Sequence, residues 1–571
     1  MAGPPALRRA VTAGLVWGAA AVFVSLAGMV EMMHARAILS GVVSLGQGLL
    51  LLAVFGSGYT AARAARARGG AGLLAGGLAG CAAAVPVAVL VLAGERVNLR
   101  TMFVNASPAL FRILTFDRGA AAVWAIPILG AVAGGLGAAA VVVPAVWRRP
   151  VSWGVASVLV LSIFQELIQL ILQSEGLPAL VREFLYAPDG PSVPGGTAAF
   201  LGTAAAAGIW PRVSRPAQAR VRKMPPVGRG LVRAALLGAG LLALLLVPVA
   251  GGPFVAQVIV IVGLYTLMGL GLNLEVGLAG LLDLGFVAFF AIGAYTVGLL
   301  TSTGPLGIAR WSFWAAVPVA VAVSLVAGVI LGIPVLGIRG DYLAIATLGF
   351  GEITRLLVLS DFLRPWLGGS QGVLAIPKPH IGPYELSGPQ HLFYVTLVGS
   401  ALVAYVAWRL ERSRLGRAWM AIREDEDVAE ALGVNLVQVK LLAYGLGAAF
   451  AGVAGAIFAV MVGSVFPHSF QLLISINVLA LIIVGGLGST PGVVVGSLAL
   501  VGLPELLREF GEFRFLVYGA VLVAMMLLRP EGLLPAAAQR RELREAAETE
   551  PAVPAALPVA ARAEGRVEVD G

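Results

Sequence analysis

Charged residues are scarce in this sequence. They make up 12% of its 571 residues, whereas a soluble globular chain averages roughly 25%. Hydrophobic residues make up 59%, and the mean hydropathy is +0.93. A soluble core cannot enclose that much apolar side chain. The composition therefore excludes a soluble protein and predicts an integral membrane protein.

Residues that carry soluble chemistry are also few. Cys81 is the only cysteine, which excludes a disulfide framework and a cysteine metal site. The chain has three lysines and no glycine-rich turn followed by Gly-Lys-Ser/Thr, so it lacks a Walker A phosphate loop. His-Glu-x-x-His and Gly-x-Ser-x-Gly motifs are absent, and the four histidines show no ligand spacing: His34, His380, His391 and His468. We expect no catalysis by this chain alone and no bound metal or cofactor.

Positive charge is concentrated in short loops between apolar runs. The formal net charge is +9, and the densest basic cluster is PRVSRPAQARVRKMPPVGRG at 211–230, which contains no acid. A second cluster lies at 409–417. Basic short loops are typical of cytoplasmic connections in membrane proteins. The charge distribution therefore predicts cytoplasmic loops and argues against nucleic-acid binding.

Apolar runs of about 20 residues, the length that crosses a bilayer, occur throughout the chain. Those before the basic cluster are 11–31, 38–60, 71–93, 120–147, 151–173 and 196–210. Those after it are 231–250, 254–274, 277–300, 312–337, 341–360, 391–408, 438–462, 471–486, 491–508 and 512–528. The first run is longer than a signal-peptide core and lacks a convincing cleavage site, so we expect an uncleaved helix. The predicted fold class is all-α, with a core of about ten transmembrane helices preceded by about six more.

These segments divide the chain into four parts. Residues 1–210 form an N-terminal membrane module of unknown role, 211–230 a basic cytoplasmic linker, and 231–534 the helical core. The Pro/Ala-rich tail at 535–571 is predicted to be disordered and cytoplasmic. With these spans, every basic cluster falls on one side of the membrane, and the Gly/Pro-rich loop 361–390 forms a compact non-helical cap on the other.

The loop 409–437 contains a short helix of its own. Four acids, Glu424 to Asp427, precede Val428–Leu432, and Gly433 follows. Acids in a first turn complement the helix dipole, and glycine suits the position after a helix end. The apolar side chains expected to be available to a partner are Trp419, Met420, Ile422, Val428 and Leu432. A solvated charged loop is the alternative, but exposed apolar residues favour docking.

Five motifs, in order and spread over about 300 residues, resemble the M-type permease subunits of branched-chain amino acid ABC importers. They are GLNLEVGLAGLLDLGFVAFFAIGAY (271–295), IRGDYLAIATLGFGEITR (338–355), GRAWMAIREDEDVAEALGVNLVQVKLLAYGLGAAFAGVAG (416–455), GGLGSTPGVVVGSL (485–498) and LRPEGLL (528–534). The resemblance covers 231–535 and leaves the N-terminal module outside it.

The resemblance implies a hetero-oligomer in the bacterial inner membrane, with both termini of this chain cytoplasmic. Its other members would be a second related permease, two cytoplasmic ABC ATPases that bind ATP and Mg, and an external substrate-binding protein. This chain would form the translocation path for branched-chain or related amino acids.

The resemblance also implies roles for particular residues. Loop 416–437 would be the coupling loop that docks on an ATPase, through Arg417, Trp419, Arg423, Glu424, Asp425, Glu426, Asp427, Glu430 and Gly433. Candidates for the translocation path are Asn273, Glu275, Gly277, Gly280, Asp283, Tyr342 and Asn477.

Two carboxylates stand out in the apolar segment 271–295. A charge in hydrocarbon is costly, and glycine weakens helices. The presence of Glu275 and Asp283 among several glycines in one apolar segment therefore indicates a specific structural or functional role. We expect the chain to turn at the cytoplasmic face near Asn273–Val276, where Glu275 reaches headgroups or the ATPase side. Asp283 would lie deeper, either beside the pathway or hydrogen-bonded inside the bundle.

A second pair of charges lies in the segment 341–360. Glu352 and Arg355 are three residues apart, so their side chains share one face of a helix. Two charges near mid-bilayer cost less when paired and turned into the bundle. We therefore predict a structural ion pair that orients this helix, and not a pair of substrate ligands.

A stand-alone secondary transporter or channel for a small polar solute is the rival interpretation. It would need its own ion-coupling carboxylates and no docking loop, and its uptake would not depend on ATPase subunits. The sequence does not identify the substrate, because related systems also carry amides, urea and small organic acids.

The charge distribution makes a topological prediction. Single cysteines introduced at Arg220 or Asp425, in a Cys81→Ser background, should resist an impermeant thiol reagent added from outside, whereas a cysteine in loop 361–390 should react. Labelling of intact cells measures this. External labelling at either cytoplasmic position contradicts the topology.

Overall fold

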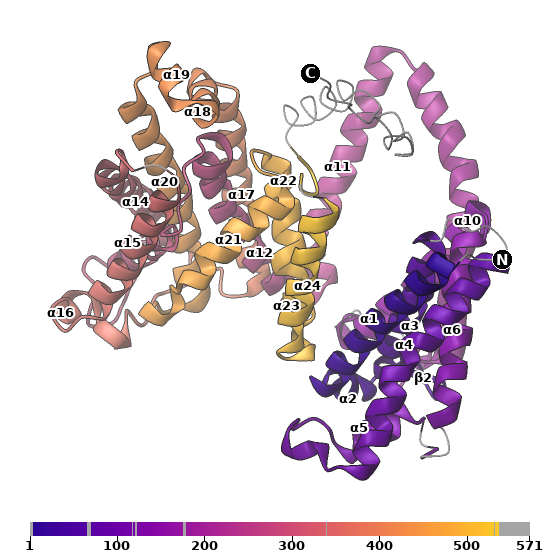
Figure 1. The fold of residues 1–571 in the computed structure, drawn as a ribbon. Coiled ribbons are helices and arrows are strands. Elements are labelled where there is room, and N and C mark those ends of the chain that lie inside the picture. Colours follow the sequence, from indigo (N-terminus) through magenta and orange to yellow (C-terminus); the bar gives the residue numbers. More distant parts are fainter. Residues whose placement is uncertain are drawn as a thin grey trace, which may run out of the picture. The chain divides into compact units, whose positions relative to one another are not determined.

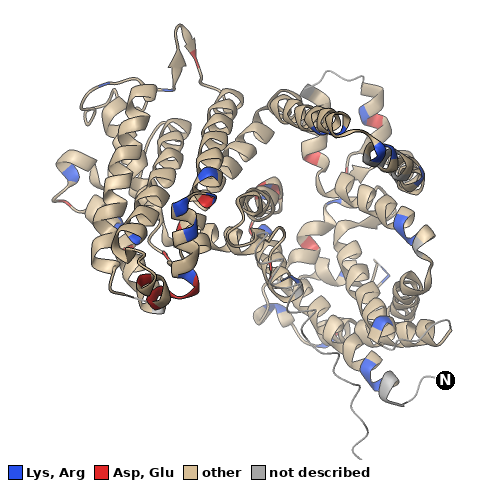
Figure 2. Cartoon of the chain, turned by 90° about the horizontal axis from the view of Figure 1, so that it is seen from above, with Lys and Arg blue, Asp and Glu red and all other residues tan. Residues whose placement is uncertain are grey.

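The computed structural model describes residues 4–64, 70–116, 118–119, 123–174, 179–338, 340–529 and 531–535. Helices dominate this part of the chain, and three two-stranded hairpins complete it (Figure 1). Charged residues are sparse along the helices (Figure 2). Among the described residues, eleven helices are long and apolar enough to cross a membrane, or up to twelve with one bent pair. The predicted all-α membrane fold is confirmed. Apart from Pro535, the predicted tail 535–571 lies outside the described residues.

The chain forms two compact units. The first comprises Met1–Gly252 with Leu506–Leu516, and the second comprises Pro253–Glu505 with Val517–Gly571. Helix α11 thus groups with the N-terminal elements, whereas the sequence assigned 231–250 to the core.

The first unit contains α1 (Pro4–Leu26), α2 (Met29–His34), α3 (Leu45–Ala64), α4 (Gly70–Arg96), α5 (Pro108–Leu114), α6 (Ala125–Val142), α7 (Ala145–Ile163), α8 (Gln165–Ser174), α9 (Ala179–Leu185), α10 (Val193–Lys223) and α11 (Pro226–Ala250). Its hairpins are β1 (Ala37–Leu39) with β2 (Val43–Ser44), and β3 (Tyr186–Ala187) with β4 (Gly190–Pro191).

The second unit begins with α12 (Gly252–Leu272), which continues as the π-helix η3 (Asn273–Leu278). Its other helices are α13 (Val287–Thr301), α14 (Phe313–Val335), α15 (Asp341–Leu359), α16 (Arg364–Leu367), α17 (Pro389–Glu411), α18 (Arg414–Glu424), α19 (Glu426–Ala431), α20 (Leu436–Val462), α21 (Leu472–Gly485), α22 (Thr490–Ser497), the π-helix η6 (Leu498–Gly502), α23 (Leu503–Leu506) and α24 (Phe513–Leu528). Its hairpin is β5 (His380–Ile381) with β6 (Tyr384–Glu385).

Several predicted spans differ from the structure in length. The run 196–210 opens the 31-residue α10, which continues through most of the predicted linker because Ala, Arg, Gln and Lys are good helix formers. The runs 277–300, 491–508 and 512–528 correspond to shorter apolar helices. The run 151–173 is bent by 73° between α7 and α8.

The start of α3 is also later than expected. The first residues of the predicted span 38–60, up to Ser44, belong to the β1–β2 hairpin, which begins at Ala37. The backbone N–H of Gln47 donates to the Ser44 hydroxyl at 3.2 Å, and the Ser44 N–H donates to the Gln47 amide oxygen at 3.2 Å. This reciprocal capping box fixes the helix start at Leu45.

Helix α20 lies at the centre of the second unit, packed against α13 and α14. Its small residues allow this close approach: a Cβ on Gly455 would lie 2.1 Å from the Phe290 carbonyl oxygen of α13. A Cβ on Gly452 would lie 2.5 Å from the Ser324 hydroxyl oxygen of α14. Membrane helices commonly use small residues in this way, because lipid offers no hydrophobic driving force for association.

The predicted external loop 361–390 is not entirely non-helical. It contains the single-turn α16, a 3₁₀ turn at Gly369–Gln371 and the β5–β6 hairpin. Lys378 Nζ donates to the carbonyl oxygens of Val460 (2.6 Å) and Met461 (2.8 Å) at the end of α20, where a cation complements the helix dipole. Burial lowers the pKa of the Lys378 ammonium.

Tight packing at Gly285 yields a stability prediction. A Cβ there would lie 2.0 Å from the Thr347 carbonyl oxygen, so Gly285→Ala should destabilise the protein by about 1–3 kcal/mol through overpacking. Thermal unfolding of the detergent-solubilised protein measures this. Gly349→Ala is the control, because no atom lies within 4 Å of its added Cβ. Equal melting temperatures for the two variants would refute the packing argument.

Candidate functional site

Glu275 lies inside the second unit. The sequence placed it at a cytoplasmic turn, but η3 continues α12 as far as Leu278, and the Glu275 side chain is 0% exposed. It packs against the backbone of α20, where a Cβ on Gly447 would lie 1.9 Å from Glu275 Oε1. The prediction that Glu275 reaches headgroups or the ATPase side is therefore wrong, because the helix does not end where its glycines begin.

The turn after η3 carries Asp283. Gly280 has φ +74°, a conformation that glycine adopts without strain, and the chain runs irregularly from there to Val287. Asp283 is 2% exposed, and its Oδ1 accepts a hydrogen bond from the Gly285 N–H at 2.7 Å. The Thr347 hydroxyl, on α15, accepts from the Leu284 N–H at 3.0 Å and steadies the same turn.

Asp283 faces two further polar groups in the interior. The Glu275 carboxyl and the Tyr444 hydroxyl, on α20, both lie close enough to interact with it. A cavity of about 160 Å³ opens beside this cluster. It is lined by Asp283, Gly285, Phe289, Leu331, Pro334, Val335, Ile338, Ala346, Thr347, Phe350 and Tyr444.

The predicted coupling loop folds as two helices, α18 and α19. Ser413 caps α18 by accepting from the Gly416 N–H at 3.3 Å, and Asp425 caps α19 by accepting from the Val428 N–H at 3.0 Å. Gly433, with φ +89°, follows the end of α19. The local sequence thus fixes both ends of α19 through an acidic cap and a left-handed glycine.

Two of the apolar side chains expected on the docking surface are buried. Trp419 is 0% exposed and donates from Nε1 to the Val439 carbonyl oxygen at 2.8 Å. Ile422 is buried as well. The apolar face of the amphipathic α18 packs on the start of α20. The large apolar side chains that stay exposed are Val428, on α19, and Leu432, at its C-cap. The exposed polar residues of the loop are Arg417, Arg423, Glu424, Asp425, Asp427 and Glu430.

Ionic and hydrogen-bond contacts attach the two helices to the membrane part of the unit. Glu426 pairs with the buried Lys440 of α20. Arg423 Nη1 donates to the Gly277 carbonyl oxygen of η3 at 2.6 Å. Gly277 also packs against Asn273, whose Oδ1 accepts from the Gly488 N–H at 2.8 Å. The predicted coupling loop therefore contacts the segment that carries Glu275.

The remaining path candidates lie apart from this cluster. Tyr342 is 77% exposed at the start of α15. Asn477, on α21, is half-buried, and its Oδ1 accepts from the Tyr518 hydroxyl at 3.1 Å. Neither residue lines the cavity beside Asp283.

Glu352 and Arg355 form an ion pair on α15, with Arg355 Nε donating to Glu352 Oε2 at 3.0 Å. The chain does not enclose the pair, because the side chains are 43% and 26% exposed. The pair lies at the edge of this chain's bundle, because Arg355 lines a small cavity together with Val287, Ala291 and Tyr295 of α13 while Glu352 remains 43% exposed.

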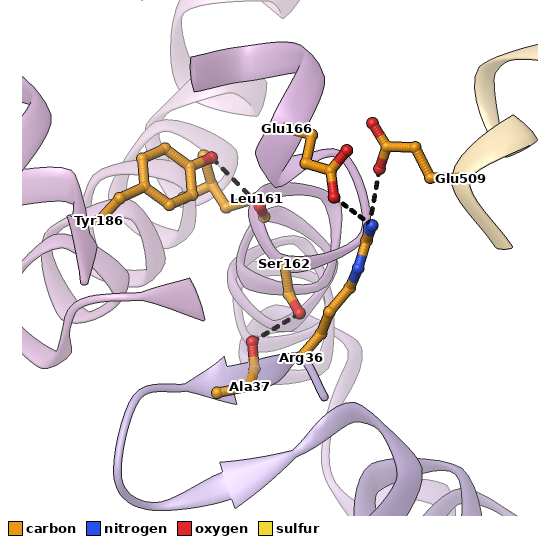
Figure 3. Close-up of polar contacts among 7 residues, drawn as sticks. All are labelled: Arg36, Ala37, Leu161, Ser162, Glu166, Tyr186 and Glu509. Carbon is orange, nitrogen blue, oxygen red and sulfur yellow. Dashed lines mark hydrogen bonds and ion pairs between the residues drawn. The ribbon is translucent and has the colours of Figure 1, made fainter. Parts of the chain in front are cut away.

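A second polar cluster lies in the first unit (Figure 3). Arg36 bridges Glu166 Oε1 at 2.6 Å and Glu509 Oε2 at 2.8 Å. Nearby, the Ser162 hydroxyl donates to the Ala37 carbonyl oxygen at 2.9 Å, which ties β1 to α7 just before its bend.

Four residues have structural contacts that the sequence did not predict: Arg36, Thr347, Lys440 and Tyr444. A lysine and a tyrosine four residues apart in an otherwise apolar helix were the available signal for Lys440 and Tyr444. Among the described residues, no group of three His, Cys, Asp or Glu side chains could hold a metal ion.

Comparison with known proteins identifies the second unit. The family described as "Branched-chain amino acid transport system / permease component" matches residues 254–528. The high-affinity branched-chain amino acid transport system permease protein LivM of Salmonella typhimurium is 42% identical over 323 residues, 52% of this chain and 74% of the relative. LivM of Escherichia coli is 42% identical over 307 residues, 50% and 71% of the two chains. LivH of Escherichia coli, another permease protein of that system, is 25% identical over 291 residues, 47% of this chain and 91% of the relative. No solved structure matches the chain.

The half-exposed ion pair on α15 can be tested by a double-mutant cycle. Removing one partner leaves a single charge at membrane depth, so Glu352→Gln and Arg355→Gln should each lower the yield of folded protein. The double variant should lose less than the sum of the two single losses, because it leaves no unpaired charge. Size-exclusion chromatography of the solubilised protein measures the yield, and strictly additive losses would contradict the pairing.

Proposed function

The chain belongs to the permease-component family of branched-chain amino acid transport systems, and we propose that it forms part of the translocation path of an ATP-driven importer. The imported solutes are branched-chain or related amino acids. The chain itself is not an enzyme: it carries no Walker A motif, and ATP and Mg bind to two separate cytoplasmic ATPase subunits. An external binding protein delivers the substrate.

The partner in the membrane is a second, related permease. Similarity of this one chain to both LivM and LivH supports a pair of homologous permeases, because the names of these relatives assign both to one transport system. Both termini lie on the cytoplasmic side of the inner membrane, in keeping with the basic loops.

The observation that carries the coupling proposal is the hydrogen bond from Arg423 to the Gly277 carbonyl oxygen. The α18–α19 pair presents Val428 and Leu432 to an ATPase surface while its other face is anchored on α20. Movement of the ATPases then reaches η3 through Arg423 and reaches α20 through the Glu426–Lys440 pair. Chains of packed and hydrogen-bonded groups can carry energetic coupling between two sites, and these contacts form such a chain.

Uptake of radiolabelled leucine, isoleucine and valine tests the function. Cells that co-express this chain with its cognate second permease, ATPases and binding protein should accumulate the label, and omission of the ATPases should abolish accumulation. Uptake that persists without ATPases identifies a stand-alone secondary transporter instead.

The same assay tests the Arg423 connection. Arg423→Gln should keep the ATPase subunits bound during co-purification but reduce uptake at least severalfold, because the side chain that contacts η3 is lost while the docking residues remain. Arg414→Gln is the control, since this exposed arginine is the first residue of the same helix and contacts neither η3 nor α20 through a described hydrogen bond. Normal uptake by Arg423→Gln removes this contact from the mechanism.

A further inference from the structure

Two buried polar groups beside the Asp283 cavity lack hydrogen-bond partners. None of the described residues donates to either oxygen of Glu275, and the Tyr444 hydroxyl is also without a partner among them. Both side chains are at least 98% buried. Buried polar groups are nearly always satisfied, so each exception needs a reason such as a ligand or an ion. Asp283 lies close to Glu275 but can donate to it only when one of the two carboxyl groups carries a proton, because two ionised carboxylates both accept hydrogen bonds and repel each other.

The missing partners and the cavity occur at one place. Tyr444 and Asp283 line the cavity of about 160 Å³, and Glu275 interacts with Asp283 from behind it. An engineered protein cavity of about 150 Å³ holds benzene, so a small organic molecule fits in such a volume. Among the described residues, the lining includes neither lysine nor arginine, and a positively charged group in the cavity would relieve the repulsion between two ionised carboxylates.

The rest of the lining is apolar. Leu331, Pro334, Val335 and Ile338 come from α14 and its C-terminal end, and Ala346 and Phe350 come from α15. A ligand whose polar side chain lay against these residues would lose its hydrogen bonds to water and gain none in return. The wall therefore excludes ligands with acidic or amide side chains. The cavity therefore combines an anionic end, one hydroxyl donor and an aliphatic wall.

We propose that this cavity is an intramembrane binding site for an apolar α-amino acid. The ammonium group binds at Asp283, with Glu275 as the second negative charge behind it. The Tyr444 hydroxyl donates to the substrate carboxylate, and the aliphatic side chain packs on Leu331, Val335 and Ile338. This assignment rests on the proposed function, and it places side-chain selection inside the permease as well as on the external binding protein.

Equilibrium binding of tritiated leucine to the full-length chain in lipid nanodiscs tests the site. Leucinol, which keeps the ammonium group, should compete more strongly than isocaproate, which lacks it. Asp283→Asn should weaken leucine binding about tenfold or more, since it removes a charge-assisted hydrogen bond. Tyr444→Phe should weaken it about fivefold through the loss of a neutral donor.

Two further variants keep the test decisive. Ala346→Phe fills the cavity without touching a polar group, so it should abolish binding even if Asp283→Asn fails to fold. Tyr295→Phe is the matched control, because Tyr295 is another buried tyrosine with an unpartnered hydroxyl among the described residues but does not line this cavity. It should bind leucine like the wild type.

The outcomes separate this site from the transport function. Wild-type affinity in Asp283→Asn or Ala346→Phe overturns the site. The site is also overturned if the chain alone binds no leucine although the assembled system imports leucine. In that case the proposed function stands. Asp283-dependent binding in a system that imports no branched-chain amino acid supports the site and rejects the function.

Discussion

The second unit is organised around a carboxyl group buried against a helix backbone. Glu275 can lie there only because position 447 of α20 is glycine, since a Cβ would overlap its Oε1 at 1.9 Å. The surrounding contacts are also tight: Gly277 admits Asn273, and Asn273 accepts from Gly488. The glycines of 271–295, which weaken a helix in isolation, allow these approaches.

One face of α20 connects this interior to the cytoplasmic helices. Lys440, Tyr444, Gly447 and Ala451 recur at spacings of three and four residues, so they form a single stripe along the helix. The stripe begins at the ion pair with Glu426, continues past the Tyr444 hydroxyl and reaches the surface against which Glu275 packs. A rigid helix with a docking contact at one end and the buried carboxylate further along can transmit a small displacement between them, because packed interiors resist compression.

Patterns that depend on local sequence were predictable. The ends of α19 followed from an acidic N-cap and a glycine with positive φ, and the apolar runs located the membrane helices. Burial did not follow from local pattern. Trp419 and Ile422 were expected to face a partner, but α18 is amphipathic and the sequence does not reveal which neighbour covers its apolar side. Glu275 was placed at a surface because the apolar runs 254–274 and 277–300 predict a turn near Asn273–Val276, and the Gly447 that accommodates its side chain lies 172 positions further along the chain.

The two carboxylates of this segment, alike in sequence, occupy different environments. Asp283 accepts from the Gly285 N–H and belongs to an ordered turn, whereas no described residue donates to Glu275. On the proposal above, a cationic group bound at Asp283 lowers the free energy of this pair of carboxyl groups. A ligand shifts a conformational equilibrium only through its differential affinity for the two states. On that proposal the bound ammonium group supplies such a difference at Asp283, and the neighbouring Glu275 lies on the same six-residue π-helix as the Arg423 contact. We therefore expect occupancy of the cavity and the position of the cytoplasmic helices to be linked through η3, whichever of the two changes first.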